Sequence, residues 1–170
     1  MHNLPAFSEI TQSGPLGMIT LRAKPDCVGL DAAIKAATGC ARPDQRQINH
    51  ASGQSAGWMS PDEYLLIVAD VRAAMTAIDQ ALAGQHYLAV DVSDARAVFD
   101  IAGQGAQVLA KLSPIDFDKL GPTELRRTRA AQVAVAIWAT GADSYRLICF
   151  RSVADYVMGL LRHSATTELV

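Results

Sequence analysis

The segment SPDEYLLIVADVRAAMTAIDQALAG, residues 60–84, is the most informative part of the sequence because it holds a predicted strand and a predicted helix in direct succession. Ser60-Pro61-Asp62-Glu63 has the form of a helix-capping box. However, the run Tyr64–Val68 that follows is aromatic, leucine-rich and β-branched, which favours a buried strand preceded by a turn. Asp70 then caps a helix whose apolar residues recur at helical spacing, namely Val71, Ala74, Met75, Ile78 and Leu82.

A similar strand and helix are predicted upstream of this stretch. Met18–Leu21 has the composition of a strand, and a helix is expected to open at Pro25-Asp26 and to close at Gly39, which suits a left-handed cap. The apolar stripe of this helix is Leu30, Ala33, Ile34 and Ala37. Residues 40–57 are expected to form a polar loop, after which Trp58 ends a short strand.

Downstream of residue 84 the pattern changes to neighbouring strands. Residues 87–92 and 95–101 are predicted to form an antiparallel pair around a tight Ser93-Asp94 turn. In the second of these strands one face carries Ala95, Ala97, Phe99 and Ile101. A short helix follows over residues 106–112, because Ser113-Pro114 stops it.

The last part of the chain repeats this order. A strand through residues 133–137 and its partner at 145–150 are joined by a turn, and Ser152 with Asp155 has the spacing of a helix cap. The stripe of this last helix is Val153, Tyr156, Val157, Leu160 and Leu161. This order of elements predicts an α+β fold with mixed or antiparallel sheets, helices packed on one side and two ferredoxin-like halves.

The predicted domain organisation is one α+β domain over residues 16–163. Residues 1–15 carry prolines and glycine without periodicity and are expected to form an N-terminal arm. Residues 164–170 are expected to be a flexible tail.

Composition excludes several classes of function. Half of the 170 residues are hydrophobic and the net charge is −2, which provides no field to attract nucleic acid. No apolar run has the length of a membrane span, and the N-terminus lacks the pattern of a signal peptide. We therefore expect a cytoplasmic protein whose three cysteines, Cys27, Cys40 and Cys149, are small core residues.

Few residues are arranged for chemistry. Gly103-Gln104-Gly105 matches a dinucleotide-binding loop poorly, and the four histidines lack the spacing of metal ligands. Asp91, Asp94 and Asp100 fall in or beside adjacent predicted strands and would suit a carboxylate pair, although turn and edge roles explain them more simply. In the simpler interpretation Asp100 pairs across strands with Arg96. No catalytic, cofactor-binding or metal-binding residue is predicted.

The densest basic cluster is the strongest polar signal. Arg126, Arg127 and Arg129 lie immediately before a predicted strand, and Arg151 lies at the end of a later one. Arginine binds carboxylates and phosphates through paired hydrogen bonds, so these residues are candidate contacts to a partner or an anion. A solvated strand entrance is the alternative interpretation.

Several segments resemble one known family. WMSPDEYLL at residues 58–66, DVSDAR at 91–96 and FRSVADY at 150–156 look like the gamma subunit of heterotetrameric sarcosine oxidase, and their order also matches. Residues 101–112 and 129–133 resemble further segments of that family, so the resemblance covers residues 55–163. Residues before 55 match less well, and Gln104 stands where relatives often carry proline.

The resemblance implies a fold similar to the folate-binding domain of aminomethyltransferases. It also implies a non-catalytic assembly subunit of a complex that demethylates sarcosine to glycine, hydrogen peroxide and 5,10-methylenetetrahydrofolate. FAD, FMN, NAD and tetrahydrofolate would be held by partner subunits and not by this chain, with the flavins and NAD on the alpha and beta subunits; alpha, beta and delta subunits would be its partners. Two alternatives stay open: a protein that binds folate or a small anion, with the glutamate tail of folate on the arginine cluster, and a self-associating homo-oligomer.

Overall fold

The computed structural model describes residues 8–166, and its chain divides into two compact units. The first unit is Pro15–Asp94, and the second combines the residues up to Gly14 with those from Ala95 onward. Each unit is a five-stranded antiparallel sheet with helices on one face. The predicted α+β class with antiparallel sheets is therefore confirmed.

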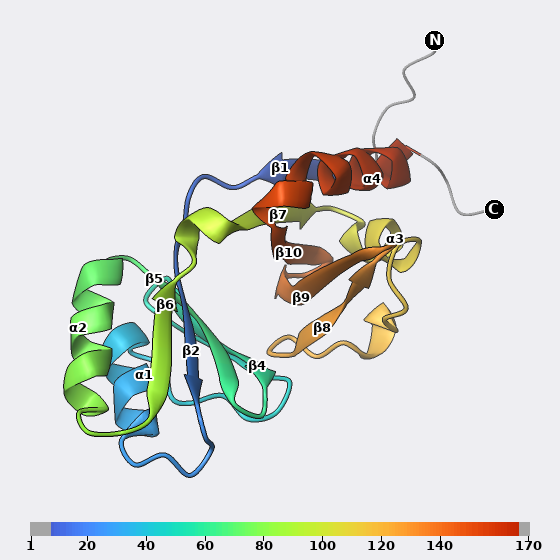
Figure 1. Ribbon diagram of the computed structural model, residues 1–170. Helices are drawn as coiled ribbons and strands as arrows, with labels where there is room; N and C mark the ends of the chain where they lie inside the picture. The colour runs from blue at the N-terminus through green and yellow to red at the C-terminus, as the bar shows by residue number, and fades with distance from the viewer. Residues whose placement is uncertain (1–7, 167–170) are drawn as a thin grey trace. The chain divides into compact units, whose positions relative to one another are not determined.

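In the first unit the strand order is β3-β4-β5-β2-β6. Figure 1 shows α1 and α2 side by side against this sheet, and their apolar stripes fill the core between helices and sheet. The elements of this unit are β2 (Gly17–Ala23), α1 (Leu30–Thr38), β3 (Ile48–Ala51), β4 (Gln54–Ser60), β5 (Glu63–Val68), α2 (Val71–Ala81) and β6 (Tyr87–Asp91).

Local signals in the sequence account for both helices of this unit. The side chain of Asp70 accepts a hydrogen bond from the backbone N–H of Ala73 and begins α2 as predicted. Gly39 ends α1 with a φ of 74°, the left-handed conformation expected of it. Burial of Ile34 and Ile78 then anchors the two helices on the sheet.

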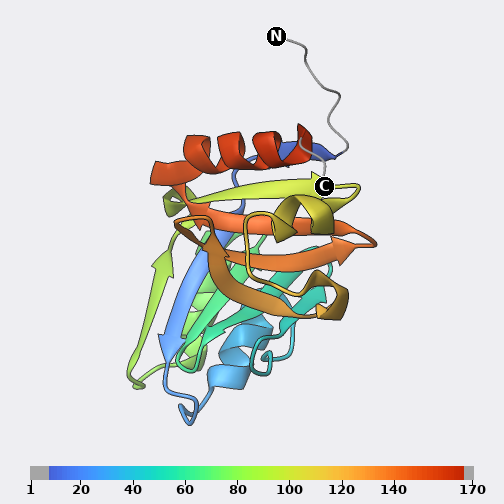
Figure 2. The same ribbon diagram turned by 90° about the vertical axis from the view of Figure 1, so that its right-hand side faces the viewer.

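The second unit has the strand order β1-β7-β10-β9-β8. Its core lies between the sheet and α4, which lies beside β1 and β10 (Figure 2). The elements are β1 (Glu9–Gln12), β7 (Arg96–Ala102), α3 (Gly105–Ala110), β8 (Leu125–Ala130), β9 (Val133–Gly141), β10 (Ser144–Phe150) and α4 (Ala154–Thr166), with short 3-10 helices over Ser93–Ala95, Phe117–Lys119 and Arg151–Val153.

The two units share one topology. Read from one edge, β4-β5-β2-β6 of the first unit corresponds to β9-β10-β7-β1 of the second, and each sheet has one extra edge strand, β3 or β8. The four matched strands and two helices of each unit have the ferredoxin-like arrangement. In the first unit the last of these strands follows α2 in the chain, whereas in the second it is β1, which comes from the beginning of the chain.

The prediction that residues 40–57 form a loop is wrong. β3 and most of β4 lie in this stretch and pair with each other, with Ile48 opposite Gly57. The stretch is polar because these strands carry Asn49, His50 and Ser55, and the His50 ring nitrogen Nδ1 lies 2.8 Å from the Ser55 hydroxyl. The first helix was also placed too early, since α1 begins at Leu30 after a left-handed Gly29.

The predicted antiparallel pair of residues 87–92 and 95–101 does not form. β6 pairs with β2 in the first unit, whereas β7 pairs with β1 and β10 in the second. The Ser93-Asp94 segment is a 3-10 helix that carries the chain from one unit to the next. The predicted inward face of β7 is confirmed, because Ala97, Phe99 and Ile101 belong to the core.

Parts of the predicted arm and tail belong to regular elements. Residues 9–12 of the expected arm form β1, with Ile10 opposite Ile101, and residues 164–166 of the expected tail belong to α4. Residues 1–7 and 167–170 lie outside the described residues. The single domain over residues 16–163 stays a prediction.

Candidate functional site

The arginine cluster lies inside a strand and not before one. Arg126, Arg127 and Arg129 belong to β8, an edge strand that forms a hairpin with β9. Because side chains alternate along a strand, Arg127 and Arg129 project from one face of the sheet and Arg126 from the other. The structure therefore splits the cluster that the sequence presents as one group.

The arginines of β8 also have partners of their own. The Arg126 guanidinium lies 2.7 Å from a carboxylate oxygen of Glu124, and Arg129 donates a 3.0 Å hydrogen bond to the backbone carbonyl of Gln132. Arg151 opens a 3-10 helix directly after β10. Since β9 lies between β8 and β10, two strand spacings, about 10 Å in total, separate Arg151 from the cluster.

The three aspartates are divided between the two units. Asp91 accepts hydrogen bonds from the backbone and side chain of Ser93 in the first unit, whereas Asp100 belongs to β7 of the second. Asp100 accepts hydrogen bonds from Arg146 and from the Ser13 hydroxyl. Burial raises the pKa of Asp100, but these hydrogen bonds outweigh it and hold that pKa below its usual value.

The expected pairing of Asp100 with Arg96 is wrong. Arg96 stacks on the ring of Phe150, with its guanidinium carbon 4.2 Å from the ring centre. Arg146 lies directly across from Asp100 on β10, so the register of the sheet selects this arginine instead.

The Gly103-Gln104-Gly105 loop has a structural role. The backbone N–H groups of Gly105 and Ala106, where α3 begins, donate to the backbone and the carboxylate of Asp143. A side chain at Gly105 would lie 2.7 Å from the ring of Tyr145. The glycine thus allows close packing of the loop on β10.

Among residues 8–166 no group of three or more His, Cys, Asp or Glu side chains could hold a metal ion. Cys40 and Cys149 are buried and Cys27 is half-buried, and all are free thiols. Burial raises the pKa of Cys149 to about 11, so this thiol stays protonated. Within the same described part of the chain, no helix is long and apolar enough to cross a membrane.

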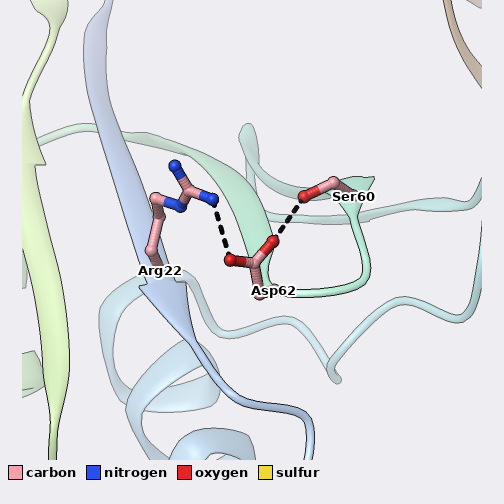
Figure 3. A network of polar contacts seen from close by, with 3 residues as sticks. All are labelled: Arg22, Ser60 and Asp62. Atoms are coloured by element: carbon pink, nitrogen blue, oxygen red, sulfur yellow. Dashed lines mark hydrogen bonds and ion pairs between the residues drawn. The ribbon is translucent and has the colours of Figure 1, made fainter.

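A hollow of about 490 Å³ with both charged and apolar side chains in its wall lies at one end of the first unit's sheet. Arg22 on β2 and Asp62 in the β4–β5 turn form an ion pair of 2.8 Å, and Ser60 donates to the other oxygen of Asp62 (Figure 3). The hydrogen bond from Arg22, followed by that from Ser60, lowers the pKa of Asp62. Lys24, His86, Tyr87 and Leu88 complete the wall with Ala23.

An exposed apolar edge adjoins this hollow. Leu88 and Val90 on the edge strand β6 are 53% and 40% exposed, although Tyr87 and Ala89 of the same strand pack on the core. The sequence predicts the strand but not this exposure. A signal was present, because every residue from Tyr87 to Val90 is apolar or aromatic and a half-covered strand would alternate with polar residues.

Comparison with known proteins identifies the family. The sequence model described as "Sarcosine oxidase, gamma subunit family" matches residues 23–168. The chain belongs to this family. The sarcosine oxidase gamma subunit of Corynebacterium sp. (strain U-96) is 31% identical over 143 residues, which are 81% of this chain and 69% of the relative. That of Arthrobacter sp is 30% identical over 137 residues, 76% of this chain and 66% of the relative.

Solved structures agree with the family and the fold. A chain of heterotetrameric sarcosine oxidase from Corynebacterium sp. U-96, in complex with pyrrole 2-carboxylate, matches with a TM-score of 0.86 and 27% identity over 96% of this chain and 88% of that one. Aminomethyltransferase T of the glycine cleavage system from Bartonella henselae matches with a TM-score of 0.62 and 13% identity over 97% of this chain and 48% of that one. The implied similarity to aminomethyltransferases is thus confirmed at the level of fold.

Proposed function

We propose that this chain is a non-catalytic subunit that assembles a heterotetrameric sarcosine oxidase. The observation that carries the proposal is its likeness to a chain of that complex, at 27% identity over 96% of its length. Alpha, beta and delta subunits would be its partners, and the complex would oxidatively demethylate sarcosine in the cytoplasm. FAD, FMN, NAD and tetrahydrofolate would bind to those partners.

The lowered pKa values of two carboxylates, Asp62 and Asp100, support a non-catalytic role. Asp62 and Asp100, whose pKa values are lowered, are each held by an arginine of the neighbouring strand or turn. A general acid or base needs a pKa near the working pH, and these carboxylates are shifted in the opposite direction. These two carboxylates therefore suit a structural role in the sheets better than a role as general acid or base.

Arg127 and Arg129, which project from one face of β8, are proposed contacts to a partner. Arg126 and Arg151 would take part at the margins, since Arg126 already pairs with Glu124. Contacts of this type steer association and weaken with salt. Arg126 projects from the other face of β8, so the three arginines of this strand do not all converge on one folate tail, which favours the assembly role over folate binding.

The test is co-expression of alpha, beta and delta with and without this chain, followed by sizing and a sarcosine-dependent peroxide assay. We expect the full complex and its activity only when this chain is present. A complex of full activity and normal size without it would overturn the proposal. Titration of the purified chain with tetrahydrofolate and light scattering at several concentrations would then separate folate binding from self-association.

A further inference from the structure

The outer edge of β6 offers a row of backbone hydrogen-bonding groups. The N–H of Val92 donates to the carbonyl of Met18, so residues 92, 90 and 88 have their backbone groups directed toward β2. By the same alternation, the N–H and C=O groups of Tyr87, Ala89 and Asp91 are directed away from the sheet. In the part of the chain that the structure describes, no strand pairs with this edge.

The side chains along this edge are apolar where a free edge would be polar. Leu88 and Val90 lie opposite Arg22 and Thr20 on the face away from the helices, and both are exposed. The corresponding edge strand of the second unit, β1, exposes Glu9, Thr11 and Gln12. Free edges are normally protected by charge or by irregularity, so β6 has the character of a strand with a partner.

The hollow at the end of β6 contains charged side chains that a segment lying on β6 could contact. Asp62 is occupied by Arg22 and Ser60, while the walls also contain the ammonium group of Lys24 and the imidazole of His86. Among residues 8–166, no carboxylate forms an ion pair with Lys24. A segment lying on β6 would therefore be complementary if it carried a carboxylate at this end.

We propose that β6 accepts an extended segment of a partner subunit as an additional strand of the first unit's sheet. Its backbone pairs with Tyr87, Ala89 and Asp91, its apolar side chains cover Leu88 and Val90, and an aspartate or glutamate enters the hollow beside Lys24. Strand addition of this kind derives affinity from backbone bonds and specificity from alternate side chains. The inference rests on the proposed function, because it names the surface through which assembly takes place.

The variant Ala89→Pro tests the backbone part of this interface. It removes an outward N–H and keeps the bonds between β6 and β2, as edge strands permit. The matched control is Gln12→Pro, because the bond from Ser13 to Val98 directs the Gln12 N–H outward from β1. Leu88→Glu and Lys24→Glu test the apolar and charged parts.

Each variant is co-expressed with wild-type chain and the three partner subunits, and the ratio of the two forms in the purified complex is measured by mass spectrometry. We expect Ala89→Pro, Leu88→Glu and Lys24→Glu to be incorporated about tenfold less than the wild type, and Gln12→Pro to be incorporated equally. Equal thermal unfolding of the isolated variants and wild type excludes a folding defect as the cause.

Normal incorporation of all three β6-side variants would overturn the inference and leave the proposed function intact. Failure of the wild-type chain to enter the complex at all would instead overturn the proposed function. If the isolated wild-type chain sedimented as a dimer and Ala89→Pro as a monomer, a second copy would be the occupant and the proposed partner segment would be wrong.

Discussion

Asp100 on β7 and Arg146 on β10 lie directly opposite each other, with Arg146 Nε 2.7 Å from Asp100 Oδ1. Both side chains are about one-third exposed, and the Ser13 hydroxyl donates to the second carboxylate oxygen. Ser13 lies directly after β1, so this carboxylate connects the beginning of the chain to two strands of the second unit.

Asp100→Asn should lower the free energy of unfolding of the isolated chain at pH 7 by on the order of 1 kcal/mol, the scale of a partly exposed ion pair. The folded pKa of Asp100 lies below the value of about 3.9 for an unfolded chain. The contribution is therefore complete above that value and is lost as pH falls through the folded pKa. Urea unfolding at pH 7 and in acid should show the difference between variant and wild type shrinking in acid.

The control for this prediction is Asp116→Asn, which removes the more exposed pair of Asp116 with Lys119. Its effect at pH 7 should be smaller. An Asp100→Asn variant as stable as the wild type at pH 7 would contradict the role assigned to the pair.

Gly29→Ala should destabilise the chain more than Gly84→Ala. Both glycines have positive φ, 87° and 76°, which costs an alanine roughly 1–2 kcal/mol. Only at Gly29 would the added methyl meet another group, the backbone carbonyl of Ala81 at 2.5 Å, because the start of α1 packs on the end of α2. Thermal unfolding of the two variants measures the difference in stability. Equal losses of stability would contradict the close packing of Gly29 on the Ala81 carbonyl.

Ser164→Ala should cost about 1–3 kcal/mol in free energy of unfolding. The Ser164 hydroxyl donates a 2.7 Å hydrogen bond to the Val108 carbonyl in a buried position, and this bond joins α4 to α3. Thr166→Ala is the control, since its hydroxyl bonds an exposed carbonyl of the same helix. Chemical denaturation measures the free energy of unfolding of both variants. If the end of α4 were frayed, as the sequence suggested, neither substitution would change that free energy.

Cys27 should react with iodoacetamide faster than Cys149 at pH 8. With a pKa of about 11, only about 0.1% of Cys149 is thiolate at that pH, and its side chain is buried. Mass spectrometry of peptides after timed labelling gives the two rates. In urea all three cysteines should react alike, and equal rates for Cys27 and Cys149 in the folded chain would contradict the buried position.

The double variant Arg127→Leu with Arg129→Leu should increase self-association of the isolated chain. Charged side chains protect an edge strand against pairing with another copy, and β8 is an edge strand. Light scattering over a concentration series measures the effect. The control pair Arg72→Leu with Arg162→Leu removes the same charge from exposed helix positions and should associate no more than the wild type. Equal association of both pairs would contradict a role specific to the edge.

Elements whose signals lie within a few residues could be predicted from the amino-acid sequence. Asp70 and the apolar stripe after it specify α2, and the run Tyr64–Val68 specifies a strand, because capping, periodicity and β-branched composition act within a few residues. Gly39 ended a helix for the same reason. The family segments around Trp58 and Phe150 also required no structure.

Only the tertiary structure decided which strands are neighbours. Residues 87–92 and 95–101 follow each other in the chain, yet their partners are β2 and β10, because hydrogen-bond register is set by contacts distant in sequence. The sequences of β1 and β3 are too polar to predict strands by themselves, and their pairing with β7 and β4 stabilises them as strands.

Because sheet order and register depend on contacts distant in sequence, the sequence also predicts little about how the candidate site residues are arranged. The sequence presents Arg126, Arg127 and Arg129 as one cluster, but the alternation of β8 divides them between two faces of the sheet. Leu88 was recognised as part of a strand, whereas its exposure depends on which strand occupies the edge. Elements specified by neighbouring residues could thus be predicted from the sequence, whereas the exposure of Leu88 and Val90 was decided by sheet order, which no local pattern encodes.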